Sequence, residues 1–409
     1  MERQKKIRAE VKLPLILIHT PFGLAFFDKV AKTGAAKVYA KSNTYLMPAI
    51  TALGIFLVVA SLMVLFSNAA AREGVRGVGP QANLLIPGLN PYLPITYGWV
   101  ALVITIIIHE AGHGVVARVH NIKVDSTGIV LILGIPIGAF VNIERDELAK
   151  ASLKQKSAIM TAGPVNNIVL AGLSLVALFL VVSTLTPLPP VSGSPHFGVL
   201  VLSVTKGSLA ESIGLTQGSV IQTVAGQEIR ALDELGKILR SNLGKTIEIT
   251  WRQENSEVKM SKLVTLPPTV EQGRGVLGIG VTPLSSDPMT VLERYKAEFG
   301  QNPLALLFPP TMQQGAVPYS DLMASKYTST LGPFFPAVAN LLFWLWFINF
   351  NVGIFNALPI GPLDGGQLYG GIIENKAKSK TLAKNANLIL TVVMVGIVLA
   401  SLVLPYVIF

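Results

Sequence analysis

The segment IIIHEAGHGVV, residues 106–116, places two histidines and a glutamate in an otherwise apolar run. His109 and His113 are four residues apart, so on a helix both imidazoles project from the same face, about 6 Å apart along the axis. Two ring nitrogens in this arrangement can bind one metal ion. Glu110 directly follows the first histidine, which suits a base that takes a proton from water at the metal. The pattern H-E-x-x-H therefore predicts a hydrolytic metal site.

The apolar surroundings of these residues favour a functional interpretation. An ionisable group at mid-bilayer costs roughly 2.5 to 3.5 kcal/mol on insertion scales, so a glutamate inside a membrane helix indicates function. The alternative is structural: the three side chains would only form hydrogen bonds between helices. Because the chain has no cysteine, any metal would depend on His, Asp or Glu ligands.

A third ligand is expected from another segment, since tetrahedral catalytic zinc takes three protein ligands and leaves the fourth position open. The segment NALPIGPLDGG, residues 356–366, contains Asp364, the only carboxylate between Asp321 and Glu374. Its two prolines forbid a regular helix, and the two glycines after Asp364 allow close backbone approach. A broken helix carrying one acid is a suitable ligand platform. The alternative is a helix-ending turn at the membrane surface.

The composition indicates a membrane protein. Hydrophobic residues make up 51% of the 409 residues and charged residues only 14%, whereas soluble chains carry charge on about 25% of residues. The net charge of +10 does not predict nucleic-acid binding, because the basic residues lie beside apolar segments, where anionic lipid headgroups are their expected partners. A membrane helix needs about 20 mostly apolar residues. Candidate spans are 46–67, 97–118, 157–183 and 385–408, with a fifth, more polar one at 335–358.

The basic residues also predict orientation. By the positive-inside rule, the segments before the first span, between the second and third, and before the last face the cytoplasm. The long insert after the third span is then extracytoplasmic. The residues counted are Lys29, Lys32, Lys37, Lys41, Arg118, Lys123, Arg145, Lys150, Lys154, Lys156, Lys376, Lys378, Lys380 and Lys384.

The segment GIVLILGIPIGAFVNI, residues 128–143, is apolar but short for a span, and Gly134, Pro136 and Gly138 interrupt it. We expect a β-hairpin with its tip at GIPIG, packed against protein or water at membrane depth; an ordinary surface loop is the alternative. Residues 1–45 are interpreted as a basic membrane-surface or re-entrant segment that is retained, because no clear cleavage site follows the basic start.

A segment of different composition follows the third span. FGVLVLSV is typical of a strand, SLAESIGL of a short helix, SVIQTVAGQEI of two strands around a turn, LDELGKILRS of an amphipathic helix and TIEITWRQ of a strand. The order and the phrase GSLAESIGLTQGSVIQTVAGQEI resemble a PDZ domain of the protease-associated type, although Leu209, Ser219 and Ala225 depart from the usual residues. Such domains bind extended peptides at a sheet edge; a spacer with an empty groove is the alternative.

The pairing of HEAGH in one span with NALPIGPLDGG in a later one resembles the site-2 protease family of intramembrane zinc metalloproteases. The resemblance implies one zinc ion per chain, bound by His109, His113 and Asp364, with Glu110 as the catalytic glutamate. AGPVNN resembles the Gly-Pro-x-x-Asn motif of the family and maps its asparagine to Asn167. Asn351 and Asn356 match polar positions before the ligand aspartate. These three asparagines could bind the substrate backbone or tie helices together.

The expected architecture is a multi-pass α-helical membrane protein with a membrane-associated β-hairpin and an inserted α+β PDZ-like domain. Its parts are an N-terminal surface segment (1–45), a first part of the transmembrane core (46–185), the PDZ-like domain (197–282), an extracytoplasmic linker (283–334) and a second part of the core (335–409).

The expected function is regulated intramembrane proteolysis, the cleavage of membrane-protein substrates within or next to their transmembrane segments. The expected location is the cell membrane, with the active site toward the cytoplasm and the PDZ-like domain outside. Expected partners are transmembrane substrates, the lipid bilayer and, by the resemblance, an upstream site-1-type protease; nucleic acid is not among them. Two alternatives are a catalytically silent scaffold and an ion- or proton-handling transporter that uses the PDZ-like domain for docking.

Overall fold

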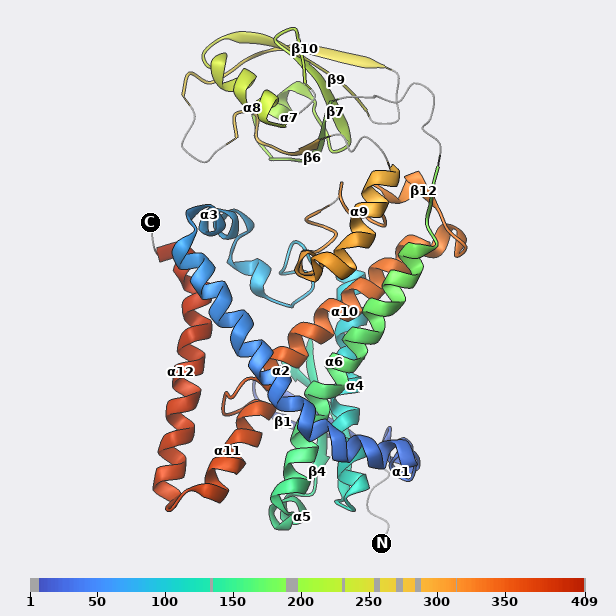
Figure 1. Cartoon of the computed structure of the whole chain (residues 1–409), viewed down its shortest axis with the longest axis vertical. Helices are drawn as coiled ribbons and strands as arrows, with labels where there is room; N and C mark the ends of the chain where they lie inside the picture. The colour runs from blue at the N-terminus through green and yellow to red at the C-terminus, as the bar shows by residue number, and fades with distance from the viewer. Residues whose placement is uncertain are drawn as a thin grey trace. The chain divides into compact units, whose positions relative to one another are not determined.

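The computed structural model describes residues 7–132, 135–188, 198–229, 232–253, 258–269, 275–283, 288–313 and 315–407. The chain forms two compact units (Figure 1). Unit 1 comprises residues 1–176 and 342–409, and unit 2 comprises residues 177–341. Because α6 and α10 cross the boundaries between the units, their bounds are given with unit 1.

Five helices in the described part of the chain are long and apolar enough to cross a membrane. This confirms the multi-pass prediction, including the fifth, more polar span. The first helix begins well before the predicted start near residue 46, because Thr33 caps it by accepting a hydrogen bond from the backbone N–H of Ala36. The five are α2 (Gly34–Ser67), α4 (Ile95–Val119), α6 (Leu153–Ser183), α10 (Phe335–Ala357) and α12 (Lys380–Val407).

Shorter elements connect these helices in unit 1. They are α1 (Leu24–Ala31), α3 (Ala69–Val78), η1 (Pro80–Asn83), α5 (Arg145–Lys150) and α11 (Asp364–Lys376).

Buried polar side chains tie α2 to its neighbours. Asn43 donates to the carbonyl of Ala158 on α6 at 2.7 Å, and Thr51 donates to the carbonyl of Ala357 at the end of α10 at 2.9 Å. Without water in the hydrocarbon region, such groups need partners inside the protein. Other interhelical hydrogen bonds run from Tyr39 to the Ala162 carbonyl, from Asn166 to the Ile108 carbonyl and from Asn349 to Thr105 Oγ1.

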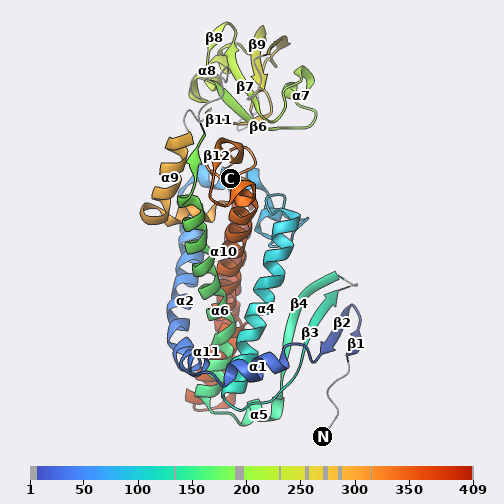
Figure 2. The ribbon, with the colours of Figure 1, turned by 90° about the vertical axis from the view of Figure 1, so that its right-hand side faces the viewer.

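A four-stranded antiparallel sheet stands beside α4 in unit 1, in the order β1-β2-β3-β4 (Figure 2). Its strands are β1 (Arg8–Lys12), β2 (Leu15–Thr20), β3 (Val124–Ile132) and β4 (Ile135–Ile143). The hairpin arms form as predicted, but the predicted tip is wrong. Ile132 pairs with Ile135, so Pro136 and Gly138 lie in β4 rather than at the tip, and residues 133–134 lie outside the described part.

The N-terminal segment also differs from the prediction. Residues 8–20 form β1 and β2, which extend the hairpin through the pairing of β2 with β3. The sequence does not predict these strands, because the apolar run LILIHT gains backbone partners only by joining a distant strand. Within 1–45, residues 8–20 therefore supply two of the four strands of the sheet, and α2 begins at Gly34.

The predicted break before Asp364 is confirmed. α10 ends at Ala357 and α11 begins at Asp364, so Pro359 and Pro362 lie in the intervening loop. A side chain at Gly365 would collide with the carbonyl of Ala357, which explains why a glycine follows Asp364.

Unit 2 contains a sheet whose described strands follow the order β10-β9-β7-β6-β11, with β8 paired to β7. The strands and helices that the sequence predicts in this segment are present. Ala225 and Gly226 turn the chain between β7 and β8, both with positive φ, 51° and 76°. The elements are β6 (Val199–Val204), α7 (Leu209–Ile213), β7 (Ser219–Val224), β8 (Gln227–Glu228), α8 (Leu232–Ser241), β9 (Thr246–Gln253), β10 (Lys259–Thr265) and β11 (Ile279–Pro283).

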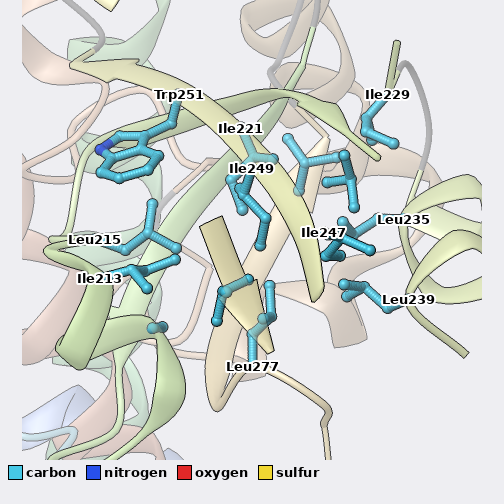
Figure 3. Packing of buried hydrophobic residues seen from close by; sticks show 14 of the residues in the cluster. Ile213, Leu215, Ile221, Ile229, Leu235, Leu239, Ile247, Ile249, Trp251 and Leu277 are labelled. Atoms are coloured by element: carbon cyan, nitrogen blue, oxygen red, sulfur yellow. The ribbon is translucent and has the colours of Figure 1, made fainter. Parts of the chain in front are cut away.

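The core of this domain lies between the sheet and its two helices. Trp251 and Ile249 of β9 and Ile221 of β7 pack with Leu235 of α8 and with Leu277 (Figure 3). The hydrophobic residues of α8 therefore face the sheet, as its amphipathic sequence predicts.

The segment 283–334 is more structured than the linker that was predicted. It contains α9 (Pro288–Gln301), the short helices η2 (Pro303–Leu307), η3 (Ala324–Lys326) and η4 (Gly332–Phe334), and β12 (Tyr327–Thr328), which pairs with β5 (Thr186–Pro187). The hydroxyls of Tyr295 and Tyr319 are hydrogen-bonded at 2.7 Å, and both side chains are buried. The proline-rich composition of the segment did not predict these helices or the buried tyrosine pair.

Candidate metal centre

Three of the predicted residues converge inside unit 1. His109 and His113 lie on α4, and Asp364 is the first residue of α11. Their facing atoms form a small triangle: 3.2 Å between the two histidine Nε2 atoms, 3.0 Å from His109 Nε2 to Asp364 Oδ2, and 3.4 Å from His113 Nε2 to the same oxygen. Both histidines are buried and Asp364 is nearly so.

The dimensions of this triangle fit a zinc ion. A tetrahedral ion with bonds of about 2.0 to 2.1 Å holds its ligand atoms ~3.3 Å apart. The three observed distances bracket this value. Two imidazole nitrogens and one carboxylate are also the donor set of many catalytic zinc sites.

Gly163 of α6 provides the wall of this site. A Cβ built on Gly163 would lie 2.6 Å from His109 Nε2 and closer still to His113 Nε2. On the facing helix, a Cβ on Gly112 of α4 would lie 2.8 Å from the carbonyl oxygen of Ala162. The two glycines let α4 and α6 approach closely, as small residues do between membrane helices.

Backbone and amide groups orient both imidazoles. His113 Nδ1 lies 2.7 Å from the carbonyl oxygen of Ile159, an acceptor only, so Nδ1 carries the proton and Nε2 is free for a metal. His109 Nδ1 lies 3.0 Å from the amide of Asn167, whose side chain is fully buried.

Glu110 is hydrogen-bonded to the sheet. Its Oε2 accepts a hydrogen bond from the backbone N–H of Val141 on β4 at 2.9 Å. The glutamate is therefore held beside the three ligand residues by a strand that comes later in the sequence.

The other predicted asparagines lie on α10. The amide groups of Asn351 and Asn356 donate to carbonyls of their own helix, those of Phe347 and Val352. By contrast Asn349, which the sequence reading did not single out, is fully buried and donates to Thr105 Oγ1 of α4 at 2.8 Å. Gly163 is likewise not predicted by its residue type alone, although it is the glycine of the AGPVNN segment.

Comparison with known families matches residues 97–300 and 312–401 to the model of Peptidase family M50. The chain belongs to this family, the site-2 proteases. As an M50 member it is a metalloprotease of the membrane, and its cofactor is zinc, for which His109, His113 and Asp364 form a suitable group.

Three similar proteins illustrate the range of the family. An uncharacterized protein of Methanocaldococcus jannaschii is 26% identical over 90% of this chain and 80% of its own length. The zinc metalloprotease RasP of Bacillus licheniformis is 30% identical over 54% of this chain and 51% of its own length. The regulator of sigma-W protease RasP of Bacillus subtilis is 24% identical over 54% of this chain and 50% of its own length.

Substitution of Gly163 tests the wall of the M50 site. We expect Gly163→Ala to lower zinc affinity at least about tenfold, because the added methyl group displaces both imidazoles. Zinc retained against a graded chelator, measured by mass spectrometry, reports the loss. Gly172→Ala on the same helix meets nothing within 4 Å and is the control. Equal zinc retention in the two variants would contradict the arrangement.

A second test concerns Asn167, which we propose positions His109. A metal bound to His109 Nε2 leaves the ring proton on Nδ1, and this N–H needs a hydrogen-bond acceptor. Asn167 Oδ1 has no hydrogen-bond partner among the described residues. If the Asn167 amide is rotated by half a turn, Oδ1 takes the place of the amide nitrogen next to Nδ1 and accepts that hydrogen bond. We expect Asn167→Leu to weaken zinc binding roughly 10- to 100-fold and Asn167→Asp to restore most of it. Unchanged zinc affinity with a raised KM would instead assign Asn167 to substrate binding.

Proposed function

We propose that this chain hydrolyses peptide bonds within or next to the transmembrane segments of membrane-protein substrates. The observation that carries the proposal is the ligand triangle with Glu110 beside it, on a helix of spanning length. A metalloprotease site on such a helix is accessible to membrane-embedded chains. The name of the Bacillus subtilis relative, which refers to a regulator of sigma-W, supports a regulatory substrate of this kind.

Glu110 is the group that moves protons in this proposal. Zinc, when bound, supplies Lewis-acid chemistry: it makes water more acidic and polarises a peptide carbonyl. Glu110 accepts a proton from the attacking water and delivers it to the leaving amine. Its hydrogen bond from Val141 holds the carboxylate beside the ligands while its other oxygen remains available for the proton.

The sheet edge at β4 is proposed to hold the substrate. In the described part of the chain, β4 is an edge strand, with β3 on one side only. Because Val141 of this strand contacts Glu110, an extended peptide added to the edge would lie beside the catalytic glutamate. A substrate helix must unwind first, since its carbonyls are hydrogen-bonded and shielded.

Asn351 and Asn356 are proposed to bind the substrate backbone. Their described side-chain hydrogen bonds stay within α10, so they do not tie helices together as Asn349 does. This leaves the substrate role as the better-supported of the two that the sequence allows.

Glu110→Gln separates the protease from its alternatives. We expect the variant to keep its zinc and to lose cleavage of a transmembrane model substrate by roughly 10²- to 10⁴-fold, because the amide cannot accept the proton. Asp364→Ala should lose zinc and cleavage together. The measurements are zinc per chain and product on a gel after reconstitution in lipid. Cleavage by Glu110→Gln at the wild-type rate would contradict the assignment, and a zinc-loaded wild type that cuts no substrate would favour the silent scaffold.

For the domain predicted at 197–282 we propose a PDZ-like role in peptide binding. A cavity of about 140 Å³ lies between α8 and β11, lined among others by Leu232, Leu239 and Leu277. β11 ends the described strand order, so its outer edge is available for an added strand. An apolar slot beside a sheet edge suits an extended peptide with apolar side chains.

The proposed placement of this domain is extracytoplasmic, with the zinc site toward the cytoplasm, on the basis of the basic residues counted above. It would then select substrates whose outer part an upstream protease has already trimmed. Protection of the domain from protease added to intact cells would contradict this placement.

Leu232→Lys tests the peptide groove. This side chain is 38% exposed at the cavity, so we expect its replacement to abolish retention of displayed extended peptides without unfolding the domain. Leu263→Lys, on β10 and 73% exposed, is the matched control and should keep the same peptides. If no peptide distinguishes the two variants, the domain is a spacer.

A further inference from the structure

A cavity of about 540 Å³ in unit 1 has a basic lining. It lies where the end of α1, the first turn of α2, the end of α4 and the start of the following loop meet, with α5 contributing one residue. The lining contains four basic side chains and two acidic ones: Lys32, Lys37, Arg118 and Lys123 with Asp28 and Glu147. None of these residues belongs to the metal centre.

Two of the four cations are available for a ligand. Arg118 Nε lies 3.1 Å from Asp28 Oδ1, and Lys123 Nζ lies 2.8 Å from Asp125 Oδ1. Within the described part of the chain, the side chains of Lys32 and Lys37 form no ion pair. With four basic and two acidic side chains, the lining carries a net charge of +2, which favours an anion there.

The position of the cavity specifies the kind of anion. α2 begins at Gly34 and α4 ends at Val119, so the cavity lies where two helices of spanning length end. The same elements expose apolar side chains: Phe26 of α1 is 58% exposed and Val38 of α2 is 67% exposed. Cations for a phosphate beside apolar surface for acyl chains match the two halves of a phospholipid.

We propose that this cavity binds the headgroup of an anionic phospholipid. Lys32 and Lys37 contact the phosphate, and the backbone N–H groups that open α2 add partial positive charge next to them. The bound headgroup also joins α1 to α4. Phe27 of α1 packs on Gly114 of α4, one residue after His113, so a headgroup between α1, α2 and α4 holds α1 against the helix that carries both histidines.

The test is a titration of the full-length, zinc-loaded protein in detergent with short-chain phosphatidylglycerol, read as the rise in Tm. Short-chain phosphatidylcholine and inorganic phosphate are titrated in parallel. Of the three ligands, we expect only phosphatidylglycerol to raise Tm. For the double variant Lys32→Ala/Lys37→Ala, the phosphatidylglycerol concentration that gives half of the maximal Tm shift should be roughly 10- to 30-fold higher than for the wild type.

The matched control is Lys29→Ala/Lys41→Ala, which removes the same charge from the same segment but from residues outside the cavity lining. It should titrate as the wild type does, and Lys32→Arg/Lys37→Arg should retain most of the affinity. Zinc content equal to that of the wild type shows that each variant is folded around its metal centre.

An equal loss of phosphatidylglycerol affinity in both alanine double variants would show a diffuse charge effect and overturn the proposal. Inorganic phosphate acting at the same lysines as strongly as phosphatidylglycerol, or phosphatidylcholine acting equally well, would overturn the lipid assignment.

Discussion

The metal centre depends on how closely α6 approaches α4. Gly112 and Gly163 lie where these helices meet, and a Cβ on either one would collide with the other helix or with the imidazoles. This contact brings the Ile159 carbonyl to His113 and the Asn167 amide to His109. A membrane offers no hydrophobic force to press helices together, so small residues and polar contacts must supply the attraction. The same contact thus provides helix packing and the orientation of two ligands.

Other parts of unit 1 hold Asp364 and Glu110 next to this pair of helices. Asp364 reaches the histidines because the chain leaves α10 and restarts as α11, and the carbonyl of Ala357 at that break is bonded by Thr51 of α2. Glu110 is held on the other side by Val141 of β4. The carbonyl of Ala357 and the carboxylate of Glu110 each have a partner inside the protein, which limits both their desolvation cost and their freedom to move.

Much of this arrangement was predictable, for reasons that differ between residues. His109, Glu110 and His113 were recognisable because helical periodicity alone places both histidines on one face. Asp364 was recognisable because it is an isolated carboxylate in a proline-broken apolar segment. The strands at 8–20 were not, since a short basic and apolar stretch becomes a strand only when a distant partner takes its hydrogen bonds. Asn349 and Asn351 have the same residue type and nearly the same position, yet only Asn349 faces another helix through a hydrogen bond.

The sequence by itself determined the chemistry of the site, the number of helices long enough to span a membrane and the element order of the inserted domain. These depend on residue type and on spacing along one element, both of which are local. Only the tertiary structure decided that Gly163 lies against the ligand triangle and that the backbone N–H of Val141 donates to Glu110. It also decided that the Asn167 amide lies next to His109 and that Lys32 and Lys37 line the same cavity. Those facts depend on which faces of separate elements meet, and packing between elements far apart in the chain leaves no periodic signal in the sequence.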